Sequence, residues 1–225
     1  MSSRKEEKER LKAEREERER LAAAKAKRSR LLQLIGGVVV ACAIIAGVAF
    51  AVSNSGGGSD DTPDVDNGKL KAAAQTSGCV YRSFPSEGDD HVSEPLTEAD
   101  YKTNPPTSGA HNPQPAGDGL YVAGNEPEIA NWVHTLEHGR IVYQYRPGVD
   151  KAVVTALEGL FNEDVKGSGG AYHSALMRNN SKMPFQVAAV AWRHYMACRE
   201  FTPTSIEAMR TFRDELVDKG PETVP

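Results

Sequence analysis

Hydrophobic residues are unevenly distributed along the chain, and the longest apolar run covers Leu31 to Val52. This run has 22 residues and no charged side chain. As an α-helix it would be about 33 Å long, which is enough to cross the hydrocarbon core of a bilayer. The pattern therefore predicts one transmembrane helix.

The charges on the two sides of this run predict its orientation. Ser53 to Ser59 carries no charge, whereas four basic residues lie just before Leu31, namely Lys25, Lys27, Arg28 and Arg30. By the positive-inside rule, the N-terminus is cytoplasmic and everything after Val52 lies outside the plasma membrane. Cleavage after Ala49-Phe50-Ala51 and lipidation at Cys42 are the alternatives. We expect an uncleaved, single-pass anchor because the apolar run exceeds a usual signal sequence and continues well past Cys42.

The region after the membrane segment mixes two hydrophobic periods. Tyr121–Ala123, Arg140–Tyr145 and Phe185–Trp192 have the composition of strands, the last of them a central strand. Lys151–Phe161 repeats apolar residues at helical spacing, and Thr204-x-x-Glu207 predicts a capping box that opens a final helix. We therefore expect a single compact α+β domain.

These patterns divide the chain into four parts. Residues 1–30 form a charged cytoplasmic helix, 31–52 the transmembrane helix, 53–69 a flexible acidic linker and 70–225 the extracytoplasmic α+β domain. The longest irregular stretch of that domain, Ser83 to Gly119, carries His91 and His111. Irregular segments of this length are often functional.

Charge narrows the range of partners. Residues 1–30 hold 12 basic and 7 acidic side chains, whereas the chain beyond Val52 holds 15 basic and 24 acidic ones. An acidic exterior domain is unsuited to nucleic acid, because phosphate recognition relies on clustered Lys and Arg. The sequence also has no nucleotide-cofactor motif, and it identifies no protein partner.

Two of the three cysteines lie beyond the membrane segment. Cys79 and Cys198 are the only pair outside, where thiols are normally oxidised, so we expect a disulfide between them. Two free thiols and a pair of metal ligands are the alternatives. Neither cysteine lies in a Cys-x-x-Cys spacing, which makes the second alternative weaker.

Three of the six histidines lie in two short motifs, Asn104–His111 and Trp132–Gly139. His134 and His138 are four residues apart, which places them on one face of either a helix or a strand. With His111 they suggest a metal site or proton transfer, because imidazole is the commonest side-chain metal ligand and titrates near neutral pH.

The order of these motifs also resembles a known family. Asn-Pro-Pro-Thr-Ser-Gly-x-His is followed by Val-His-x-Leu-Glu-His-Gly-x-Ile-Val-x-x-Tyr and later by Val-Ala-Ala-Val-Ala-Trp. Over roughly Cys79 to Cys198 the chain resembles the bacterial membrane-anchored family called domain of unknown function 3105. The resemblance implies an extracytoplasmic domain with a histidine cluster, and it implies no particular reaction.

A first-row transition metal would take His111, His134 and His138 as nitrogen ligands. His91 is the next nitrogen donor, and Met177 and Met183 are the available thioethers. A thioether would favour copper, whereas three imidazoles and a water would favour zinc. Glu137 is expected to orient an imidazole or pair with a cation rather than to bind the metal. It is not part of a His-Glu-x-x-His motif, which argues against zinc-protease chemistry.

Two classes of function remain. The first is an extracytoplasmic protein that binds copper or zinc, for metal handling or for a metal-dependent reaction. The second is a non-catalytic interaction or structural module of the cell envelope, in which the histidines form a hydrogen-bonded network. Whether the protein is an enzyme does not follow from the sequence.

The predicted topology can be tested on cells. Protease added to intact spheroplasts should remove the C-terminal domain, because the basic cluster retains only the N-terminus inside. Immunoblotting with antibodies against each end would follow the cleavage. Protection of the C-terminal domain until the cells are lysed would contradict the orientation.

Overall fold

β-Branched and aromatic side chains fill strand β3 (Ile141–Tyr145), which lies inside a six-stranded mixed sheet. The computed structural model describes residues 65–222 and 224. β3 pairs in parallel with β4 and antiparallel with β5, and the strand order is β1-β6-β5-β3-β4-β2. The other strands are β1 (Val80–Ser83), β2 (Gly119–Leu120), β4 (Ser174–Arg178), β5 (Val187–Ala191) and β6 (His194–Cys198).

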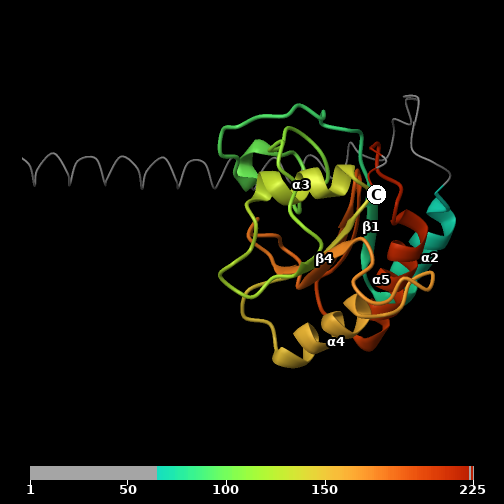
Figure 1. Cartoon of the computed structure of the whole chain (residues 1–225). Helices are drawn as coiled ribbons and strands as arrows, with labels where there is room; N and C mark the ends of the chain where they lie inside the picture. Colours follow the sequence, from blue (N-terminus) through green and yellow to red (C-terminus); the bar gives the residue numbers. More distant parts are fainter. Residues whose placement is uncertain (1–64, 223, 225) are drawn as a thin grey trace, which may run out of the picture. The chain divides into compact units, whose positions relative to one another are not determined.

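Helices cover both faces of this sheet (Figure 1). α4 (Lys151–Phe161) connects β3 to β4 and allows these strands to run parallel. With α2 (Asn67–Ser77) and α5 (Pro203–Leu216) it packs on one face, while α3 (Ile129–Glu137) lies on the other. The predicted α+β class is confirmed, and so are the bounds of α4 and the interior position of β5.

Two hydrophobic cores follow from the alternation of side chains along the strands. Ile141 and Tyr143 of β3 face the core under α2, α4 and α5. Val142 faces the other core, where it packs with Trp132 and Leu136 of α3. β3 and β5 are thus buried on both faces, which explains their nearly continuous apolar runs.

Several predicted boundaries differ from those of the structure. The predicted linker of residues 53–69 overlaps α2, which begins at Asn67, and the strand predicted at Phe185–Trp192 is the shorter β5. The strand expected at Tyr121–Ala123 is β2, at Gly119–Leu120, because pairing with β4 ends at Tyr121 and the chain then turns. The last helix begins at Pro203 rather than at the predicted Thr204 box. Thr202 is its N-cap, and its backbone N–H donates to Oγ of Ser205. Proline suits the first helical position because its fixed φ and missing N–H cost nothing there.

Several predictions concern residues outside the described part of the chain. They are the charged helix of residues 1–30, the transmembrane helix of residues 31–52 and most of the linker of residues 53–69. Among the residues that are described, none of the helices has the length and apolar character needed to cross a membrane.

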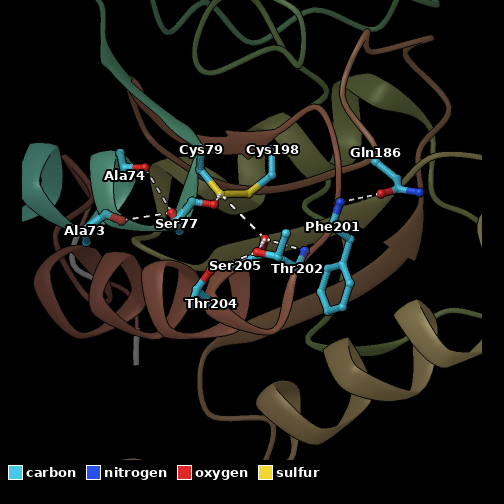
Figure 2. The surroundings of a disulfide bond; sticks show 10 residues. All are labelled: Ala73, Ala74, Ser77, Cys79, Gln186, Cys198, Phe201, Thr202, Thr204 and Ser205. Atoms are coloured by element: carbon cyan, nitrogen blue, oxygen red, sulfur yellow. Dashed lines mark hydrogen bonds between the residues drawn. A yellow bond between two sulfur atoms is a disulfide. The ribbon is translucent and has the colours of Figure 1, made fainter.

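The predicted disulfide is present. Cys79 follows α2, Cys198 ends β6, and their sulfur atoms are bonded beside Ser77 and Ser205 (Figure 2). Ser205 Oγ lies 3.8 Å from Cys79 Sγ. The bond joins residues 119 positions apart and ties the first described helix to the C-terminal part of the sheet.

Loss of this disulfide should destabilise the domain strongly. In the chain-entropy model, closing a loop of this length lowers the conformational entropy of the unfolded chain. This raises the free energy of the unfolded state by about 4 to 5 kcal/mol. We therefore expect the Cys79→Ser/Cys198→Ser double variant to melt at least about 8 °C below wild type. Calorimetry without reductant would measure the difference, and equal melting temperatures would contradict the prediction.

Candidate metal centre

The C-terminal turn of α3 presents two polar side chains to one point. His134 and Glu137 are three residues apart and therefore share a helix face. The opposite face of the helix carries Trp132 and Leu136, which are fully buried against the sheet. Apolar packing thus fixes the helix, and the fixed helix positions the imidazole and the carboxylate.

The long irregular stretch brings two further histidines to the same place. His91 and His111 form an isolated parallel bridge, in which Val92 N–H donates to the His111 carbonyl at 2.8 Å. The next part of this stretch runs along α3, where Asn112 N–H donates to the carbonyl of Ala130. Backbone hydrogen bonds therefore join residues that are 19 and 18 positions apart in the sequence.

Three imidazoles form a nearly equilateral triangle. The ring centroids of His91, His111 and His134 are 4.7 to 4.8 Å apart. His111 is completely buried and His134 almost so, whereas 43% of the His91 side chain is exposed. The triangle is therefore closed on the protein side and reaches solvent at His91.

Backbone carbonyls determine the tautomers of the two buried imidazoles. Nδ1 of His111 lies 2.8 Å from the Gly109 carbonyl, and Nδ1 of His134 lies 2.6 Å from the Asn112 carbonyl. A carbonyl oxygen only accepts, so each Nδ1 carries the hydrogen. In the neutral imidazoles, Nε2 therefore carries no hydrogen and has a free lone pair.

These lone pairs converge on the Glu137 carboxylate. Its Oε2 is 2.9 Å from Nε2 of His111 and 4.0 Å from Nε2 of both His91 and His134. The His111 contact is short, yet it lacks the geometry of a hydrogen bond. Within the described part of the chain, Nε2 of His111 and Oε2 of Glu137 are buried without a hydrogen-bond partner. Two buried acceptors facing each other are unfavourable unless a metal ion or a shared proton lies between them.

Burial favours the neutral form of three histidines and of Glu137. It lowers the pKa of His111, His134 and His138 below 6.5 and raises the pKa of Glu137 above 4.5. At neutral pH the histidines thus have their metal-binding form. The carboxylate is costly to ionise in this position without a positive charge beside it.

His138 belongs to a second, adjoining group with His134 and Glu222. As the C-cap of α3, it meets the ring of His134 edge to face, with ring centroids 4.5 Å apart. Its Nε2 is 3.3 Å from Oε2 of Glu222. Residues 218–222, which we call the C-terminal strap, bring this glutamate to the end of α3.

The strap is bonded closely to the turn after α3. Asp218 N–H donates to the Gly139 carbonyl at 2.8 Å, and Glu222 N–H donates to the Glu137 carbonyl at 3.1 Å. Gly220 crosses so near that a Cβ would lie 2.0 Å from the Glu137 carbonyl oxygen. Only glycine fits there.

The structure brings together two of the three residues predicted as principal ligands, His111 and His134. His91, a weaker candidate, joins them, while His138 lies one ring further out. Met177 and Met183 are buried in the apolar core under α3, and neither is among the described groups of converging donors. The carboxylate of Glu137 points into the triangle, where it could serve as a metal ligand. Its i,i+3 spacing from His134 could have indicated this position.

The comparisons with known proteins agree with this description. A family model described as a protein of unknown function (DUF3105) matches residues 91–224, a range that includes all four histidines and both glutamates of the two groups. The search of curated proteins found no match, and neither did the search of solved structures. The match covers more than half of the chain, and the chain belongs to the DUF3105 family of proteins of unknown function.

Proposed function

We propose that this protein binds one divalent transition-metal ion, zinc or copper, through Nε2 of His91, His111 and His134 and the carboxylate of Glu137. The observation that carries the proposal is the pair of buried, unpartnered acceptors that face each other at 2.9 Å. A cation between them turns this repulsion into coordination.

The spacing of the donors suits a small ion. Tetrahedral coordination at about 2.0 to 2.1 Å places neighbouring ligand atoms about 3.3 Å apart. The distances from Oε2 of Glu137 to the three Nε2 atoms are 2.9, 4.0 and 4.0 Å, on both sides of that value. Side-chain shifts of under about 1 Å would complete the tetrahedron.

The surroundings also support metal binding. The carbonyls of Gly109 and Asn112 hold two imidazoles through Nδ1, as the outer partners of ligating histidines commonly do. The ring of His111 packs against Trp192 at 6.0 Å, so the site is apolar on its inner side. Such surroundings fix the rings before an ion arrives.

The donor set indicates the class of ion. Three nitrogens and one carboxylate oxygen suit Zn²⁺ or Cu²⁺, whereas Cu⁺ favours sulfur donors. Among the described residues, both cysteines are in the disulfide and the two candidate methionines lie in the apolar core. We therefore propose a divalent ion.

We further propose that the site lies outside the cytoplasm on a membrane-anchored chain. The uncharged run of residues 31–52 and the basic residues before it support this placement. The disulfide supports it independently, because such bonds persist in oxidising compartments.

Metal binding can be measured on the purified full chain. Titration with Zn²⁺ and Cu²⁺ against a chromophoric chelator should give one ion per chain. His111→Ala, His134→Ala and Glu137→Gln should each weaken binding more than about 100-fold, the upper range for a group that merely supports a ligand. Glu200→Gln is the control for Glu137→Gln, since Glu200 is exposed and belongs to neither group.

The alternative of a purely structural histidine network gives a different result. Wild type would then bind no ion, and truncation of His134 would only destabilise the fold by leaving the Asn112 carbonyl unpaired, at about 1 to 3 kcal/mol. Equal metal content in wild type and the His111→Ala/His134→Ala variant would contradict the metal proposal directly.

The affinity should depend on pH in a defined direction. Protons compete with the ion for imidazole and carboxylate, and burial holds the pKa of His111 and His134 below 6.5. We therefore expect the Kd to be nearly level above about pH 6.5 and to rise steeply below it. The raised pKa of Glu137 strengthens the competition at acidic pH. Calorimetric titrations at several pH values would check this, and a Kd that falls on acidification would contradict it.

A further inference from the structure

We infer that His138 and Glu222, together with His134, form an outer metal position from which an ion passes to the inner site. This inference rests on the proposed function, because it requires an inner site that binds the ion. It assigns a role to the two converging side chains that the inner site does not use.

The key residue is His134, which belongs to both groups. Its Nδ1 is occupied by the hydrogen that it donates to the Asn112 carbonyl, so Nε2 is its one available lone pair. A single lone pair ligates one ion at a time. The inner and outer positions are therefore alternatives, and an ion that leaves one of them remains bound to His134 as it enters the other.

Burial increases steadily along this series of side chains. The exposed fraction is 47% for Glu222, 13% for His138, 6% for His134 and zero for His111. A carboxylate at the surface attracts a hydrated cation, and each following imidazole can replace a water ligand. The ion is thus never without a protein ligand between solvent and the buried site.

The outer position is held in place by the C-terminal strap. The bond from Glu222 N–H to the Glu137 carbonyl connects the outer glutamate to the residue that supplies the inner carboxylate. With Gly220 packed against the same turn, the strap has little freedom to move away. The two positions are therefore only about one imidazole ring apart, as the 4.5 Å separation of the His134 and His138 rings shows.

A competing route leads past His91, whose side chain is 43% exposed. An ion entering there would reach the inner site without contact with His138 or Glu222. The two routes therefore differ in which variants slow the exchange of metal, and this difference makes the inference testable.

The first test isolates the outer position at equilibrium. In full-length His91→Ala/His111→Ala, which lacks two inner ligands, we expect weaker binding of one Zn²⁺ per chain. Adding His138→Ala should weaken it by at least a further factor of about 10, whereas adding Glu200→Gln, at an exposed carboxylate outside both groups, should not. His111 is buried, and its loss can destabilise the fold, so the same comparison is made in the background His91→Ala/Glu137→Gln. Glu222→Gln is the second change made at the outer position. Equal residual affinity with and without these outer changes would overturn the inference.

The second test measures exchange in the otherwise wild-type chain. Stopped-flow transfer of Zn²⁺ from a chromophoric chelator should be at least about 10-fold slower in Glu222→Gln, and unchanged in the control Glu200→Gln, an exposed carboxylate at the end of β6. Unchanged rates in Glu222→Gln and His138→Ala would favour entry past His91 and overturn the inference, while wild-type binding would still support the proposed function. Two ions bound at once by wild type would contradict the shared role of His134, and no binding by wild type would overturn both proposals.

Discussion

The arrangement of the site depends on two hydrogen bonds from imidazoles to backbone carbonyls. Gly109 and Asn112 accept the Nδ1 hydrogens of His111 and His134, which leaves both Nε2 lone pairs directed at the same carboxylate. If the hydrogen of His111 were on Nε2, His111 could donate to Glu137 and the cluster would be an ordinary buried network. Instead the acceptors face each other, and the carbonyls that create this conflict belong to a segment held on α3 by its own backbone hydrogen bonds. The histidine chemistry is thus set by the course of the main chain.

The regular elements were predictable where one strong local pattern defined them. The spacing of Val153, Leu157 and Leu160 leaves only one buried face for α4, and the β-branched run of β3 is bounded by a Pro-Gly turn. The disulfide was predictable because only two cysteines lie beyond the predicted membrane segment, where thiols are normally oxidised. The start of the last helix was missed because the Thr202–Ser205 pair competes with Thr204–Glu207, and the proline between them favours the earlier start.

The metal centre was predictable only in part, because its donors come from segments joined by non-local contacts. Spacing within α3 indicated His134, and the Asn104–His111 motif indicated His111. The bridge that places His91 beside His111 has no counterpart in local periodicity, so only the fold reveals it. The position of Glu137 beside the imidazoles was not predictable, because a strand and a helix direct it to opposite sides and the spacing of His134 and His138 is compatible with either.

The covalent ring closed by Cys79 and Cys198 contains all four histidines, while Glu222 lies outside it. When the oxidised chain unfolds, the imidazoles stay in one loop and remain at a high effective concentration. If the proposed ion binds, an unfolded chain of this kind keeps some affinity for it, and the ion then stabilises the oxidised fold less than its native affinity alone implies. A reduced chain loses that confinement. The oxidation state of two distant sulfur atoms thus determines how much of the binding free energy of a metal appears as folding free energy.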